Sequence, residues 1–257
     1  MKAIVQDLYG PADVLELRRT CPRTAGPTAG WLAEAGRAAP LLASVLVVAA
    51  HPDDETFGLG AVIATMAAVG AAVHVLCFTR REASTLNEND ADLHRAREEE
   101  LRRAGRELGV ASVTLLDCPD GCLGSVEPGE LDAAVRRWTA RCHADGLLVF
   151  DDTGITGHPD HQAATAAAVR VGAAAGLPVL AWALTEPVAA QLRKETGQPF
   201  AGCPADRIDV CVRVDRARQR RAALMHASQI SPSAVLWRRL QLQADREHLR
   251  WLVPGGS

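Results

Sequence analysis

The sequence predicts an α/β fold in which a mostly parallel sheet carries helices on both faces. From residue 44 onward, short apolar segments alternate with longer segments of helical periodicity, and the links between them are short. Ala, Val and Leu dominate the apolar residues, whereas aromatic residues make up only 4% of the chain. The chain has 257 residues, so we expect one large domain over residues 41–257, after a partly looped N-terminal extension of residues 1–40.

Each element follows from its local pattern. Residues 44–50 (SVLVVAA) form a continuous apolar run, as expected for a strand that is buried on both faces. Residues 90–108 form a charged helical segment that ends at Gly109, and Gly176 ends an Ala-rich helix in the same way. We predict strands at 44–50, 72–79, 112–117, 146–150, 178–184 and 208–214, and helices at 61–69, 90–108, 130–143, 160–175, 215–227 and 233–252.

Composition excludes several classes of function. The formal net charge is −3, and the clustered Glu and Arg residues of 90–108 mix both signs at helical spacing, so no nucleic-acid surface is expected. The longest apolar run, residues 38–50, is too short to cross a bilayer, and residues 1–10 lack the layout of a secretory signal. We therefore expect a cytoplasmic protein with no stable membrane insertion, while the oligomeric state stays open.

The cysteines do not indicate a structural metal site. There are seven, an odd number, and no two CxxC motifs occur. Cys118 and Cys122 flank a short loop, Cys-Pro-Asp-Gly-Cys, and we expect them to remain thiols in a reducing cytosol.

Two short segments carry residues suited to metal chemistry. His51-Pro-Asp-Asp-Glu55 directly follows the first predicted strand, and Gly157-His-Pro-Asp-His161 follows the fourth. The carboxyl ends of parallel strands meet at one edge of a sheet, so segments about 100 residues apart can form one site there. His and carboxylate are the usual ligands of catalytic zinc. For the first segment alone, an acidic helix start is the competing interpretation.

Together, the two segments resemble the LmbE-like, or PIG-L, family of zinc-dependent N-acetylglucosaminyl deacetylases. The resemblance covers about residues 44–252 and includes a weaker match at His226-Ala-Ser-Gln229. It implies a Rossmann-like sheet flanked by helices and a single deacetylase domain over residues 41–257. It also implies an enzyme that hydrolyses linear, non-peptide C–N bonds and removes an acetyl group from an N-acetylglucosamine-type conjugate.

The resemblance also implies roles for individual residues. Its zinc ligands fall on His51, Asp54 and His161, and its general base falls on Asp53. A protonated His158 would stabilise the oxyanion, and either His158 or Asp53 would protonate the leaving amine. Zn²⁺ is the expected cofactor, with another divalent metal as the alternative. The expected partner is a small N-acyl molecule, such as a glycoconjugate.

The substrate contacts are predicted from position. Arg80, Arg81 and Glu82 follow the second predicted strand, although many relatives have Gly near position 81. Thr156 stands where the mycothiol-pathway relatives have Tyr, which changes the expected substrate. His226 either lines the site or is a structural histidine.

Other interpretations compete with this one. A dinucleotide-binding enzyme is suggested by Gly58-Leu-Gly60, but these glycines lie outside the strand-to-helix turn and the third small residue is missing. A metal-binding protein without activity would not need Asp53. An amidase of a non-sugar N-acyl compound uses the same groups and is the main alternative. The first twenty residues resemble the start of zinc-type alcohol dehydrogenases, but no cofactor domain follows.

Overall fold

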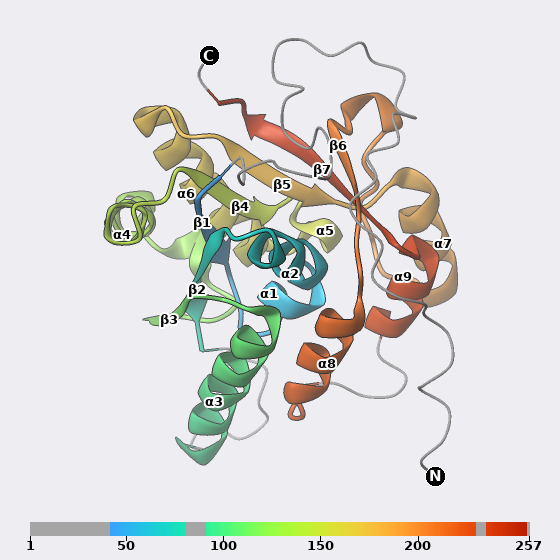
Figure 1. The fold of residues 1–257 in the computed structure, drawn as a ribbon, viewed down its shortest axis with the longest axis horizontal. Helices are drawn as coiled ribbons and strands as arrows, with labels where there is room; N and C mark the ends of the chain where they lie inside the picture. Colours follow the sequence, from blue (N-terminus) through green and yellow to red (C-terminus); the bar gives the residue numbers. More distant parts are fainter. Residues whose placement is uncertain (1–41, 81–90, 230–234, 256–257) are drawn as a thin grey trace.

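The strands form one continuous mixed sheet. The computed structural model describes residues 42–80, 91–229 and 235–255, and its strands run in the order β3-β2-β1-β4-β5-β7-β6 (Figure 1). The strands are β1 Ser44–Ala49, β2 Ala72–Thr79, β3 Ser112–Cys118, β4 Gly146–Phe150, β5 Val179–Ala183, β6 Val210–Arg213 and β7 Arg246–Val253. Strands β1 to β5 pair with one another in parallel. Strand β7 runs antiparallel to both of its neighbours, β5 and β6. The predicted mostly parallel α/β fold is confirmed.

Helices cover both faces of the sheet, because the central strands are apolar on both sides. In β1, Val45 and Val47 belong to one apolar core, while Leu46 and Val48 belong to the other. The first core is closed by α2, α3, α7 and α8, and the second by α4 and α6. The helices are α1 Asp54–Phe57, α2 Gly60–Ala68, α3 Ala91–Leu108, α4 Pro128–Arg141, α5 Gly154–Gly157, α6 Pro159–Ala175, α7 Glu186–Thr196, α8 Ala217–Met225 and α9 Val235–Gln243.

The end of the chain differs from the sequence-based expectation. We predicted one helix over residues 233–252, but α9 ends at Gln243, Ala244 turns the backbone at a φ of 49°, and β7 follows. The Arg, Trp and Leu residues of this segment are compatible with either helix or strand. The backbone of β7 hydrogen-bonds to strands on both sides, and this tertiary pairing decides its conformation. Helix α7 was not predicted.

The order in which successive strands are added to the sheet reverses between β1 and β4, which lie side by side and parallel. The chain leaves β1 toward β2 and β3 on one side, and β4 begins the other half of the sheet. In open α/β sheets, ligands bind beyond the carboxyl ends of the strands at this position. The segments that follow β1 and β4 are the two that carry the His-Pro-Asp sequences, so the topology brings them to one place.

The predicted N-terminal extension, residues 1–40, lies outside the described residues, as does the dehydrogenase-like segment within it. None of the helices in residues 42–80, 91–229 and 235–255 combines the length and apolar character needed to cross a bilayer.

Candidate metal centre and active site

The carboxylate of Asp54 is fixed at the end of β1. Its Oδ2 accepts hydrogen bonds from the backbone N–H groups of Ala50, at 3.1 Å, and His51, at 2.9 Å. Asp54 begins α1 and is only 6% exposed. Two backbone donors hold one oxygen, so the other oxygen, Oδ1, is presented to the second segment in a fixed direction.

His161 meets Asp54 from the start of α6. Its Nδ1 lies 3.2 Å from the carbonyl oxygen of Gly154, to which it donates, and its Nε2 lies 3.2 Å from Asp54 Oδ1. The bond to Gly154 places the ring proton on Nδ1 and leaves Nε2 as the coordinating atom. Between β4 and α6 the chain makes a tight turn in which Ile155 has a φ of 66°.

Three ligand atoms therefore converge. His51 Nδ1 lies 3.3 Å from His161 Nε2 and 3.6 Å from Asp54 Oδ2, and the ligand atoms of this group all lie within 4.8 Å of one another. Two unprotonated imidazole nitrogens that point at one place repel each other through their lone pairs, whereas both can bind a cation there. Two histidines and one carboxylate match the three-ligand set of catalytic zinc, so the residues present fit a zinc ion.

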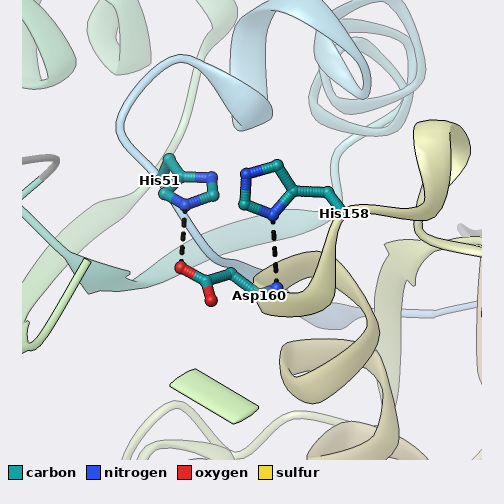
Figure 2. Close-up of side chains that lie close together, drawn as sticks. All are labelled: His51, His158 and Asp160. Carbon is teal, nitrogen blue, oxygen red and sulfur yellow. Dashed lines mark hydrogen bonds and ion pairs between the residues drawn. The ribbon is translucent and has the colours of Figure 1, made fainter. Parts of the chain in front are cut away.

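The other ring nitrogen of His51 contacts two carboxylates. His51 Nε2 lies 3.1 Å from Asp120 Oδ1 and 3.2 Å from Asp160 Oδ2, and Figure 2 shows the latter contact. Asp160 is itself held by the backbone N–H groups of Gly121, at 2.7 Å, and Leu123, at 3.0 Å. A carboxylate behind a ligating histidine fixes the ring and raises its basicity. His51, His158 and Asp160 form a second candidate metal group, but Asp160 is already bonded and is better suited to support His51.

Sequence reasoning gave no role to Asp120 or Asp160. Asp160 lies between the two histidines of the second segment, and Asp120 follows the carboxyl end of β3. The rule that located the other site residues, namely position after a parallel strand, applies equally to Asp120.

The charges of these groups shift their pKa values together. Burial favours the neutral ring of His51, but the carboxylates of Asp120 and Asp54 outweigh it and raise the pKa of His51 to about 10. Burial likewise opposes charge on His161, yet the negative Asp54 raises the pKa of His161. Burial disfavours the ionised Asp54, but His161 and His51 hold its pKa well below the usual range. The site thus keeps the Asp54 carboxylate charged and holds a proton on His51, where a metal would bind.

His158 lies beside the candidate ligands, and one of its ring nitrogens is hydrogen-bonded. Its Nδ1 accepts the backbone N–H of Asp160 at 3.2 Å, the second dashed contact in Figure 2. Its ring stacks on His161 with centroids 4.7 Å apart and meets His51 edge-on at 4.8 Å. Burial, reinforced by the positive charges of His161 and His51, lowers the pKa of His158. A neutral ring with its proton on Nε2 follows from these contacts.

Asp53 adjoins the candidate ligands and has an unusual backbone conformation. It is 5% exposed and has a φ of 108°, a conformation that residues other than glycine adopt at a cost of about 1–3 kcal/mol. Such conformations persist only where surrounding contacts enforce them.

The residues predicted to contact substrate lie in different environments. Arg80 is bound by Glu98 Oε2 at 3.1 Å and Asp117 Oδ1 at 3.0 Å, so its charge is balanced within the protein. Thr156 is partly exposed on α5, directly before the second segment. His226 is fully buried, and its Nε2 lies 2.9 Å from Glu55 Oε1. Arg81 and Glu82 lie outside the described residues.

Comparison with known proteins identifies the segment that carries these groups. Residues 46–171 match the sequence model described as PIG-L: GlcNAc-PI de-N-acetylase. This part of the chain belongs to the PIG-L family. The PIG-L segment contains every predicted metal ligand, Asp53 and His158, and the predicted family resemblance is confirmed.

Curated relatives of the PIG-L segment are similar over part of their length. A 1D-myo-inositol 2-acetamido-2-deoxy-alpha-D-glucopyranoside deacetylase of Kineococcus radiotolerans is 31% identical over 49% of this chain and 44% of its own length. A probable N-acetylglucosaminyl-phosphatidylinositol de-N-acetylase of Schizosaccharomyces pombe is 31% identical over 50% of this chain and 51% of its own length. The chain thus spans about half the length of the curated relatives that it matches.

Solved structures share the fold beyond the PIG-L segment. The deacetylase of the A40926 pseudoaglycone superposes with a TM-score of 0.62 at 21% identity, covering 84% of this chain and 99% of its own. The 4-carboxy-2-hydroxymuconate hydratase of Pseudomonas putida superposes with a TM-score of 0.61 at 20% identity, covering 83% of this chain and 98% of its own. At these identities the similarity establishes the fold alone.

Proposed function

We propose that the protein is a zinc-dependent hydrolase that removes an acetyl group from the amide nitrogen of an N-acetylglucosamine-type conjugate. The observation that carries the proposal is the convergence of His51 Nδ1, His161 Nε2 and the Asp54 carboxylate beside the buried Asp53, within the PIG-L segment. Membership of that segment in a family described as a de-N-acetylase supports the reaction class.

His51, Asp54 and His161 would hold the metal. When bound, zinc lowers the pKa of a coordinated water and polarises the acyl oxygen. Asp54 supplies negative charge, and the carboxylates of Asp120 and Asp160 behind His51 keep its ring in one orientation. Another divalent metal with the same ligand preference is the alternative.

Asp53 acts as the general base in this proposal. The carboxylate takes a proton from the attacking water as the water oxygen bonds to the acyl carbon. The C–N bond then breaks as the leaving nitrogen gains this proton from Asp53, because the neutral ring of His158 could give up its one proton only by becoming an imidazolate. Water is consumed, and the products are the free amine and the carboxylic acid.

His158 stabilises charge on the acyl oxygen. Because its Nδ1 accepts from the Asp160 backbone, the proton on Nε2 is the one available to an oxyanion. If the ring were doubly protonated, Nδ1 would carry a proton and could no longer accept the hydrogen bond from the backbone N–H of Asp160. We therefore assign the neutral ring to this role, in place of the protonated ring that the family resemblance implied.

The substrate class is inferred from the named relatives. Both curated relatives carry names that specify an acetamido group on a glucosamine unit, although the aglycone differs between them. A small glycoconjugate is therefore the proposed partner. A non-sugar N-acyl compound remains the alternative, because the metal, the water and the base are indifferent to the rest of the molecule. A cytoplasmic location stays a prediction of the sequence.

The proposal is tested by amine release. The zinc-loaded protein is incubated with N-acetylglucosamine linked to inositol, to phosphatidylinositol and to malate, and with unrelated N-acetyl amines of similar size. We expect amine release from at least one glucosaminide, and a loss of release after chelation that added zinc restores. Release only from the non-sugar amides would favour the alternative, and absence of release from every compound would contradict the proposal.

A further inference from the structure

A fully buried carboxylate holds the backbone of Asp53. Glu55 Oε2 accepts the backbone N–H of Asp53 at 2.9 Å, and Glu55 has no exposed surface. This bond spans only two residues, so it closes a tight ring around the residue with the left-handed φ of 108°. The side chain of Glu55 is therefore in a position to stabilise a conformation that is unfavourable by itself.

The second oxygen of Glu55 is bound from another part of the chain. Glu55 Oε1 lies 2.5 Å from Thr56 Oγ1 and 2.9 Å from His226 Nε2. His226 has no exposed surface and lies at the end of α8, with its ring edge-on to Phe57 at a centroid distance of 5.6 Å. A buried carboxylate needs partners for its oxygens, and His226 supplies the one that is distant in sequence.

The turn that follows α8 is hydrogen-bonded to α3. Glu100 Oε1 accepts the backbone N–H of Ser228 at 2.9 Å, and Glu100 Oε2 accepts from Ser228 Oγ at 2.6 Å. Helix α3 packs against α8, and Figure 1 shows the two helices side by side. The contacts thus run from α3 through the turn after α8 to Glu55, and from Glu55 to the Asp53 backbone.

We propose that Glu55 is the positioning residue of Asp53 and that His226 holds Glu55 in place for this purpose. The inference rests on the proposed function, in which Asp53 is the base. In this inference His226 supports the site by holding Glu55, and it does not contact substrate. Proton transfer demands accurate placement, and a displacement of about 1 Å can lower a rate by about 100-fold. A carboxylate that fixes the main chain of the base therefore affects turnover without touching substrate or metal.

The kinetic test compares truncation with a conservative change. In Glu55→Ala, the N–H of Asp53 loses its acceptor, so we expect kcat to fall by about 100-fold with KM and zinc content near wild type. In Glu55→Gln, an amide oxygen still accepts from Asp53, so most of kcat should return. His226→Gln, which can still donate to Glu55, should keep more of kcat than His226→Leu.

A second measurement does not depend on activity. Amide hydrogen exchange at Asp53 should be about tenfold or more faster in Glu55→Ala than in the wild type and near wild type in Glu55→Gln. Asp145→Ala is the matched control, because Asp145 also accepts two backbone N–H groups, at 2.8 and 3.1 Å, but at the opposite end of β1. It should alter neither kcat nor the exchange at Asp53.

The outcomes separate this inference from the proposed function. Unchanged exchange at Asp53 in Glu55→Ala, or a kcat near wild type in that variant, would overturn the inference. Loss of zinc from Glu55→Ala would also overturn it, because Glu55 would then act through the ligand Asp54. If wild-type protein releases no amine from any substrate, the proposed function fails, and hydrogen exchange alone still decides whether Glu55 positions Asp53.

Discussion

Both ring nitrogens of His51 contact other residues of the site, so its ring links the candidate metal ligands to the carboxylates behind them. Nδ1 faces Asp54 and His161, while Nε2 faces Asp120 and Asp160. A histidine held on both sides has a fixed orientation before any metal arrives. The same carboxylates keep the ring protonated in the metal-free protein, so a metal has to compete with a proton at this position.

Zinc binding should therefore weaken as the pH falls. The pKa of His51 is raised to about 10, so its ring carries a proton at neutral pH that zinc must displace. Despite the burial of His161, the negative Asp54 raises the pKa of that ring as well, which acts in the same direction. Affinity should rise with pH up to about 10, where the zinc-free ring of His51 loses its proton. Titration calorimetry in buffers of different ionisation enthalpy measures the released protons.

Asp120→Asn is the informative control for this prediction. Removing that carboxylate lowers the pKa of His51, so zinc binding to the variant should release fewer protons. An affinity that does not change with pH, in either protein, would contradict the assignment of His51 as a ligand.

At the scale of elements, the site depends on a close approach between α1 and β4. A Cβ on Gly58, the residue after α1, would overlap the ring of Phe150 at the end of β4. Phe150 in turn meets the His161 ring edge-on at a centroid distance of 4.9 Å. Gly58 is thus required by packing, and the same packing supports the candidate ligand His161.

Gly58→Ala should destabilise the fold and weaken zinc binding together. Overpacking of a filled core costs about 1–3 kcal/mol in the free energy of unfolding, and displacement of Phe150 moves the ring against His161. Denaturant unfolding and a zinc titration check the two effects. In Gly129→Ala, in α4, the added Cβ meets open space, so this variant should neither destabilise the fold nor weaken zinc binding. A zinc affinity unchanged in Gly58→Ala would refute the link.

At the scale of the whole molecule, the sheet topology unites segments that are far apart in sequence. Apolar periodicity predicted the five parallel strands to within two residues at either end. Four of them, β1, β2, β4 and β5, are largely buried and consist mostly of apolar residues, whereas β3 is a partly exposed edge strand. Position after a strand then predicted where His51 and His161 would meet. Both predictions depend on local pattern and on one general rule of α/β folds.

Other features depend on contacts that local sequence does not encode. Strand β7 was predicted as helix because its partners, β5 and β6, are distant in sequence. For His226 the sequence left open whether it lines the site or is a structural histidine. Its burial against Glu55, which favours the second, becomes visible only when α8 packs over α1. The roles of Asp120, Asp160 and Glu55 likewise follow from distances between segments.

In the proposed mechanism Asp53 moves protons while its neighbours bind the metal, and the kcat of zinc-loaded Asp53→Asn is the most direct test of this division. Asn tolerates a left-handed backbone as Asp does, so the turn should be kept. We expect a zinc content equal to wild type and a kcat lower by about 100- to 10,000-fold. A kcat near the wild-type value with zinc bound would contradict this division.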